Sequence, residues 1–182
     1  MNTNIQDARI SKTRQKVMDA GAVLLFTQGW DHVTHQKLAQ ETGIARGTLY
    51  RHWSTIDDLL VDIVINCDPA PYAAKITGNL PSDLVEELAL LITNLHNSKL
   101  GDVILNAARM ASDNPKIAII HRTTQKILLE SLIKKWGGAP RPSDDHIANM
   151  LLGPVLYHHL FGGSGTLDLE QLVHSFLTMH QP

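Results

Sequence analysis

Apolar residues recur at helical spacing along most of the chain, and the alternating pattern of a β-strand is nearly absent. In the run from Ser11 to Gln28, for example, Val17, Leu24 and Leu25 fall on one helical stripe. This periodicity predicts an all-α fold of about nine helices.

The expected helices are separated by two segments that are rich in proline and glycine, residues 67–83 and 137–145. The first of these breaks predicts two domains, one over residues 1–55 and one over residues 68–182, with a connecting helix over about 55–67. The other expected helices cover residues 11–28, 34–41, 46–53, 83–98, 102–111, 115–136, 145–161 and 168–179.

The composition is that of a globular protein, with 43% hydrophobic and 19% charged residues among 182. No apolar run approaches the roughly 20 residues of a membrane span, so no membrane partner is expected. The N-terminal sequence has no apolar core of a signal peptide, and the single Cys67 cannot form an intrachain disulfide. We therefore expect a cytoplasmic protein without a cofactor.

The formal charge is distributed unevenly along the chain. Residues 1–55 carry seven Lys or Arg and four acidic residues, a balance of +3, which leaves −5 for the remainder because the total is −2. A basic N-terminal part is the candidate to meet a polyanion, although solvated surface charge alone also produces such differences.

The stretch GIARGTLYRHW, residues 43–53, predicts a helix with an unusual number of outward hydrogen-bonding groups. Two short helices joined by a tight turn with a glycine form a helix-turn-helix, whose second helix enters the major groove of DNA. If Leu49 points inward, Arg51 lies nearly opposite and can contact a guanine edge, while Thr48 can touch a base. Helix-turn-helix geometry gives these candidate DNA-binding residues: Thr34, Gln36, Lys37, Arg46, Gly47, Thr48, Tyr50, Arg51 and His52.

The run VTHQKLAQETGIARGTLYRHWSTIDDLL, residues 33–60, follows a helix that ends in LLFTQGW. It resembles the DNA-binding region of the tetracycline-repressor (TetR) family of bacterial transcription regulators, in register and without a gap. The matching positions are Thr34, Leu38, Ala39, Gly43, Ile44, Gly47, Thr48, Leu49, Tyr50, His52, Trp53 and Leu59.

Three positions depart from the usual pattern of the family. Ala45 replaces the Ser that normally caps the recognition helix, and the loss of a cap costs about 1 kcal/mol. Ile56 stands where a Lys usually contacts a phosphate, and Gly21 stands where Ala is usual. These replacements predict modest DNA affinity or compensation by other basic residues, such as Lys37.

The resemblance implies a homodimer that binds a double-stranded DNA operator and leaves it when a small molecule occupies the C-terminal domain. The segment 145–161 is apolar on nearly every side and 168–179 has an apolar stripe, so both are expected to pair with their two-fold copies. The expected interface residues are Leu151, Val155, His158, Leu169, Leu172, Val173, Phe176 and Leu177.

The small-molecule effector is not identified by the sequence, but the apolar interior expected of the helices over 83–136 favours a hydrophobic or amphipathic compound. The same residues could instead be ordinary core. The candidate pocket residues are Leu88, Ile92, Leu95, Ile104, Ala107, Met110, Ile120, Thr124 and Ile127.

Ten histidines suggest an alternative, a metal-binding or metal-sensing protein built on His158, His159, His174 and His180. Adjacent histidines on a helix point about 100° apart, however, so His158 and His159 cannot both face one ion. A small enzyme is a further alternative, but the GGSG run at 162–165 follows no strand that would form a nucleophile elbow. We therefore expect neither a metal site nor catalytic residues.

Overall fold

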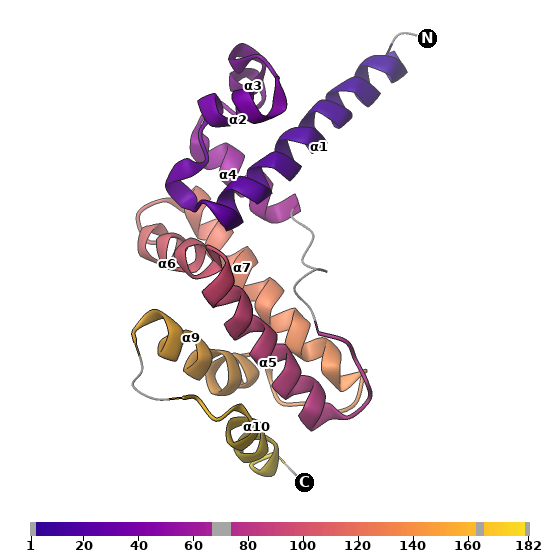
Figure 1. The fold of residues 1–182 in the computed structure, drawn as a ribbon. Helices are drawn as coiled ribbons and strands as arrows, with labels where there is room; N and C mark the ends of the chain where they lie inside the picture. The colour runs from indigo at the N-terminus through magenta and orange to yellow at the C-terminus, as the bar shows by residue number, and fades with distance from the viewer. Residues whose placement is uncertain (1–2, 67–73, 163–165, 181–182) are drawn as a thin grey trace. The chain divides into compact units, whose positions relative to one another are not determined.

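The computed structural model describes residues 3–66, 74–162 and 166–180, and the side chains of this range from Lys12 onward. This part of the chain is helical and contains no strand (Figure 1). None of its helices combines the length and the apolar character that crossing a bilayer requires. The chain divides into two compact units, Met1–Asp68 with Asp102–Thr123, and Pro69–Gly101 with Thr124–Pro182.

Unit 1 is built around the long helix α1 (Thr3–Thr27), against which α2 and α4 pack. It also contains η1 (Trp30–His32), α2 (His35–Thr42), α3 (Arg46–His52) and α4 (Ile56–Asn66). The segment Asp102–Thr123 adds most of α6 (Leu100–Met110) and the first half of α7 (Pro115–Ile133) to this unit.

The core of unit 1 joins the apolar stripes of α1, α2, α3 and α4 to Val103, Ala107, Ile117 and Ile120. Gly21 of α1 lies against α4. A Cβ atom there would lie 2.4 Å from Cδ1 of the fully buried Ile63. The tight packing of these two helices therefore favours glycine at this position.

Unit 2 contains α5 (Leu80–Asn97), the remainder of α7, and the short helix η3 (Lys134–Trp136). Its C-terminal part contains α8 (Asp144–Ile147), η4 (Ala148–Leu152), α9 (Gly153–Leu160) and α10 (Leu169–Thr178). The helix α5 lies against α9, α10 and η3.

The segments α8, η4 and α9 follow one another without a break, and η4 is a π-helical turn. The π turn is identified by the hydrogen bond from the Gly153 N–H to the Ala148 carbonyl, five residues earlier. Pro154 follows directly and has no N–H to donate, and its ring would crowd the carbonyl one turn back in a regular α-helix. The widened turn provides room for this proline, in place of the simple bend that the Gly-Pro pair alone suggests.

A buried ion pair in unit 2 binds the backbone of Ala74, in the segment before α5. The Lys135 ammonium lies 2.8 Å from a Glu87 carboxylate oxygen, and it also donates to the Ala74 carbonyl at 2.6 Å. Glu87 in turn accepts from the Ala74 N–H at 2.8 Å. These mutual bonds satisfy the polar groups of two charged side chains that are almost completely buried.

The all-α prediction is confirmed, and the predicted helices reappear within a few residues of their expected bounds. The first helix begins earlier than expected, at Thr3. The compact units differ from the division at residues 55–68, because 102–123 pack with the N-terminal helices. Cys67 and most of the GGSG run lie outside the described residues.

Candidate nucleic-acid interface

The turn between α2 and α3 is fixed by local hydrogen bonds at both of its ends. The Thr34 hydroxyl oxygen accepts the Lys37 N–H at 3.1 Å and so caps α2. At the other end of α2, Gly43 has φ of 70° and donates its N–H to the Ala39 carbonyl. This left-handed conformation favours glycine and sends the chain directly into α3.

The helix α3 is anchored by its apolar side and exposes its polar one. Leu49 is fully buried, and Trp53, at the C-terminal end of the helix, is 3% exposed. Ala45 precedes the helix without a side-chain cap. The outward residues are exposed, apart from the half-buried Thr48, and they comprise Arg46, Gly47, Tyr50, Arg51 and His52.

Two side chains of the predicted set are already oriented within the protein. The Arg51 guanidinium donates to the Thr48 hydroxyl at 3.1 Å, which holds it along the outer face of α3. The Lys37 ammonium lies 3.2 Å from Glu41, one turn further along α2. Thr34 and Gln36 are exposed at the start of the same helix. The structure thus brings the nine predicted residues onto two consecutive helices.

His35 was not among the predicted residues, yet it connects the two helices. Its side chain is buried, its ring stacks on Tyr50, and its Nε2 lies 2.8 Å from the Trp53 carbonyl. The sequence held a signal for this role, because His35 shares a helical stripe with Leu38 and Thr42, which are also buried.

Asp62 forms a second connection that the sequence analysis missed. One of its carboxylate oxygens accepts from the Trp53 indole N–H and from the Arg14 guanidinium, both at 2.7 Å. Lys16, also on α1, donates to the Thr42 carbonyl at 2.7 Å. Two exposed basic side chains of α1 therefore bond to α4 and α2 within this domain.

The start of α4 is a reciprocal cap, in which Thr55 and Asp58 exchange backbone and side-chain hydrogen bonds. The Lys116 ammonium lies 2.7 Å from Asp58 and, with the Thr55 hydroxyl, lowers the pKa of this carboxyl from 3.8 to about 2. Asp57 accepts a hydrogen bond from Asn114 at 2.8 Å. Ile56, the first residue of α4, packs against the core.

The expected dimer-interface residues fall into two groups. Leu151, Val155, Val173 and Phe176 are at most 1% exposed, so they belong to the interior of their own unit and the interpretation of these four needs correction. Leu169, Leu172, Leu177 and His158 are half-buried. A helical stripe alone does not tell a core from an interface, because both require apolar residues at the same spacing.

The expected pocket residues are divided between the two units. Ile104, Ala107, Met110 and Ile120 belong to unit 1, where Ala107 and Ile120 are part of the hydrophobic core. The remaining residues belong to unit 2, with three side chains buried and two half-buried: Leu88, Leu95, Thr124, Ile92 and Ile127.

The histidines of unit 2 associate in pairs. The rings of His96 and His159 lie 4.6 Å apart, and those of His146 and His180 lie 4.5 Å apart. Burial, followed by the charges of His96 and His158, lowers the pKa of His159. Among the described residues, no group of three or more His, Cys, Asp or Glu side chains is placed to hold a metal ion.

Comparisons with known proteins agree with this geometry. A sequence profile described as "Bacterial regulatory proteins, tetR family" matches residues 17–63. The chain is 26% identical over 155 residues to the HTH-type transcriptional regulator AqdR of Rhodococcus erythropolis, covering 82% of this chain and 74% of that protein. It is 26% identical over 164 residues to the uncharacterized HTH-type transcriptional regulator YdeS of Bacillus subtilis, covering 86% and 82%.

A search of solved structures finds a related fold over nearly the whole chain. The crystal structure of the TetR family transcription regulator SCO0332 has a TM-score of 0.72 and 21% sequence identity, and the match covers 94% of this chain and 100% of that one. The helical arrangement beyond the matched N-terminal segment is therefore also that of a known fold.

Proposed function

Because the chain belongs to the TetR family of transcription regulators, with a helix-turn-helix for DNA binding, we propose that it is a cytoplasmic homodimeric repressor. Its operator is palindromic, and a small apolar or amphipathic molecule releases it from the DNA. The observation that carries this proposal is the surface of α3, where Arg46, Tyr50, Arg51 and His52 are exposed around the buried Leu49.

The outward residues match the chemistry of a major-groove contact. Arg51 keeps guanidinium N–H groups for the two acceptors of a guanine edge, and Gly47 lets the backbone approach the groove. The Thr34 hydroxyl accepts its capping bond and retains its proton for a phosphate oxygen. Phosphate contacts from Gln36 and Lys37 would fix the register of α3 on the duplex.

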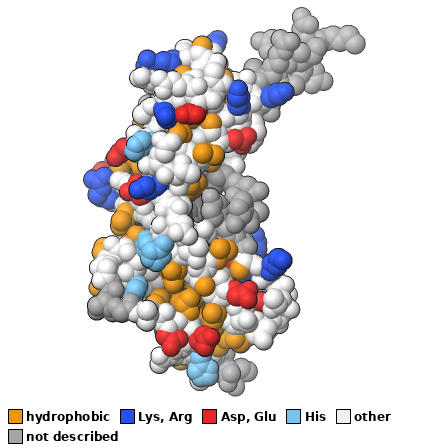
Figure 2. Space-filling model, viewed as in Figure 1, with side chains coloured by type: hydrophobic (Ala, Val, Ile, Leu, Met, Phe, Trp, Pro, Cys, Tyr) orange, Lys and Arg blue, Asp and Glu red, His pale blue; other side chains and the backbone are white. Residues whose placement is uncertain are grey.

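Two exposed aromatic side chains support the dimer. Tyr157 and Phe161 are 67% and 68% exposed and lie against each other, with ring centroids 5.5 Å apart and planes inclined by 34°. Hydrophobic side chains also gather on the face of unit 2 that Figure 2 shows. Pairs of exposed aromatic side chains are typical of protein interfaces. A second copy of this chain would bury both rings. A two-fold pair would present two recognition helices about 34 Å apart.

Coupling between effector and DNA is supported by α7, one helix that belongs to both units. At its N-terminal end, Lys116 is paired with Asp58, and the preceding Asn114 is bonded to Asp57. Both partners lie in the first turn of α4, next to the recognition helix in the chain. A ligand that shifts α7 within unit 2 would move these contacts and thereby change the position of α3.

The experiment is a selection of genomic fragments with the purified full-length protein, followed by footprinting of the bound site. We expect a palindrome with half-sites about one helical turn apart. Tyr157→Glu combined with Phe161→Glu should yield a monomer with weakened operator affinity, whereas Val23→Glu, at an exposed apolar position of unit 1, should remain a DNA-binding dimer. Protection of a single unrepeated half-site by the wild type would contradict the proposal.

A further inference from the structure

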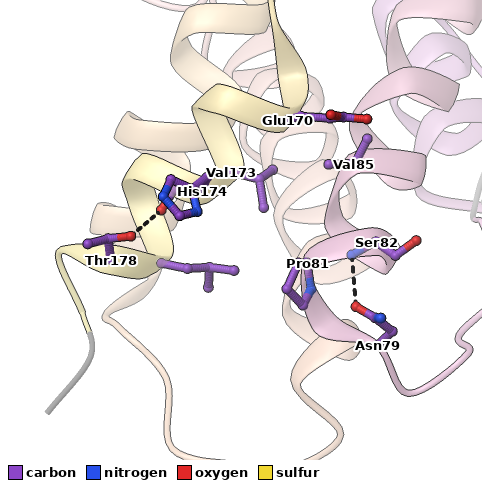
Figure 3. A pocket seen from close by; sticks show the side chains of 9 residues that line it. Asn79, Pro81, Ser82, Val85, Glu170, Val173, His174 and Thr178 are labelled. Atoms are coloured by element: carbon purple, nitrogen blue, oxygen red, sulfur yellow. Dashed lines mark hydrogen bonds between the residues drawn. The ribbon is translucent and has the colours of Figure 1, made fainter.

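A cavity of about 410 Å³ opens between the first turns of α5 and one side of α10, within unit 2 (Figure 3). Small-molecule sites typically measure roughly 300–1,000 Å³. Val173 is buried at its base, and Val85, Leu177 and Pro81 complete the apolar lining. None of the pocket residues expected from the sequence lines this cavity, so it is a separate candidate site.

The cavity has a negative charge at its edge. Glu170 extends from α10 toward α5 (Figure 3), and it is the single residue of the described lining with a formal charge at neutral pH. No Lys or Arg belongs to that lining, and Glu170 has no ion pair within the described part of the chain. A cationic group entering the cavity would therefore find a carboxylate that has no competing partner.

The N-terminal end of α5, which would otherwise favour an anion, already has its own acceptors. The Asn79 side chain caps the helix by accepting the Ser82 N–H at 3.3 Å. Asp83 lies buried in the same turn and accepts hydrogen bonds from the N–H groups of Thr77 and Gly78. Acidic and capping side chains thus offset the positive end of the helix dipole, and the local charge disfavours an anionic ligand.

Two hydroxyl groups also belong to the lining, but neither adjoins Glu170. The Thr178 hydroxyl donates its proton to the His174 carbonyl at 2.8 Å, and it lies eight residues, or about 12 Å, from Glu170 along α10. The Ser82 hydroxyl points away from α10 (Figure 3). The Glu170 carboxylate is therefore the acceptor of the lining for an ammonium group, whose further N–H donors remain in contact with water at the edge of the cavity.

We propose that this cavity binds a small amphipathic cation, such as a protonated primary amine with a compact apolar group. The ammonium pairs with Glu170 and the apolar group packs on Val85, Val173 and Leu177. The bound molecule joins α5 to α10 and stabilises their packing. The proposal concerns a site apart from the DNA-binding surface and stands independently of the effector residues proposed on α5, α6 and α7.

Calorimetric titration of the full-length protein with phenethylammonium chloride tests the proposal. The neutral 2-phenylethanol and the anionic 3-phenylpropionate carry the same apolar group and serve as matched ligands. We expect the amine to bind and the other two to bind at least about tenfold more weakly. Glu170→Gln should weaken amine binding by a similar factor, whereas Glu86→Gln, which removes an exposed charge from α5 outside the cavity, should not.

A second variant separates binding from stability, because a carboxylate in the first turn of α10 also favours the helix itself. Val85→Phe keeps Glu170 and narrows the cavity beside it, so it should weaken amine binding with little change in the melting temperature. Equal affinity for amine and alcohol, wild-type affinity in Glu170→Gln, undiminished binding in Val85→Phe, or no amine binding at millimolar concentration would each overturn the proposal. Operator binding by the same variants, recorded separately, reports on the proposed regulator function alone.

Discussion

The imidazole of His35 stacks on the phenol ring of Tyr50, with ring centroids 4.2 Å apart and planes inclined by 17°. The Nε2 of the same imidazole lies 2.8 Å from the Trp53 carbonyl, and since a carbonyl oxygen only accepts, this nitrogen carries the proton. One side chain at the start of α2 thus holds both an outward residue of α3 and the residue that ends it.

Replacement of His35 by alanine should therefore weaken the domain and its DNA contact together. The Trp53 carbonyl would lose a buried partner, at a cost of about 1–3 kcal/mol in the free energy of unfolding, and Tyr50 would lose its stacking surface. Chemical denaturation measures the first effect and operator titration the second. The exposed His32 provides the matched control, and a His35→Ala protein as stable as His32→Ala would show that the contact contributes nothing.

Arg51→Ala should abolish specific operator binding while the melting temperature stays unchanged, because this side chain is exposed and its one bond is to the Thr48 hydroxyl. The loss of a bidentate guanine contact is worth roughly 1–3 kcal/mol. Arg51→Lys keeps the positive charge but loses the planar guanidinium that donates two parallel hydrogen bonds. It should therefore discriminate between DNA sequences as poorly as Arg51→Ala. Unchanged affinity at fixed salt in both variants would place base recognition elsewhere. Leu49→Ala should instead lower stability by about 2–5 kcal/mol.

Gly21→Ala should destabilise unit 1 although alanine is the better helix former by about 1 kcal/mol. The added Cβ would meet Cδ1 of Ile63 at 2.4 Å in a fully buried position, and overpacking of this kind costs about 1–3 kcal/mol. Ile63→Val removes the nearer carbon. In a double-mutant cycle measured by denaturant unfolding, the pair should lose less stability than the two single changes combined, and simple additivity would argue against the clash.

The Lys116–Asp58 pair predicts sensitivity to acid. The folded-state pKa of Asp58 is about 2, below its ordinary 3.8, so its stabilising contribution is present above 3.8 and is lost as pH falls toward 2. Lys116→Gln should raise the pKa of Asp58 toward its ordinary value, which carbon NMR of the carboxyl group measures directly. Lys126→Gln, in an exposed pair on the same helix, should leave that pKa in place.

His159 predicts a second dependence on pH, near neutrality. Its pKa is lowered from 6.5, first by burial and then by the charges of His96 and His158. A histidine with a depressed folded-state pKa contributes stability above 6.5 and loses it as pH falls through the folded value. The melting temperature of the wild type should therefore drop more between about pH 8 and about pH 5 than that of His159→Gln. If the melting temperatures of the two proteins change with pH in parallel, His159 is not the cause of the pH dependence.

The features predictable from the sequence are those that depend on neighbouring residues. Thr34 caps α2 and Gly43 ends it because a hydroxyl and a left-handed backbone serve those positions whatever packs around them. The positions of Leu49 and Arg51 around α3 follow from helix geometry in the same way. The exposed face of α3 was therefore predictable from the sequence alone.

Contacts between distant segments were not predictable in this manner. Asp62 joins Arg14 and Trp53 across 48 and 9 residues, and Lys135 meets Glu87 although neither position looks buried in the sequence. The apolar stripe of α10 gave no means to assign Val173 and Phe176 to the protomer's own interior. Such assignments depend on which elements lie opposite, and that is a property of the tertiary fold.

The π-helical turn at Ala148–Leu152 sets how this chain tolerates changes in length. A π turn holds one residue more than the α-helical path needs, so deletion of a single residue there would convert it to regular helix and leave the residues that follow facing the same way. Val155 would stay in the interior, whereas a deletion in the regular helical part would rotate all that follows by about 100° and expose it. Among homologous chains, changes in length should therefore collect in the loop of residues 137–143, and a single-residue deletion between Asp144 and Leu160 should fall within this turn.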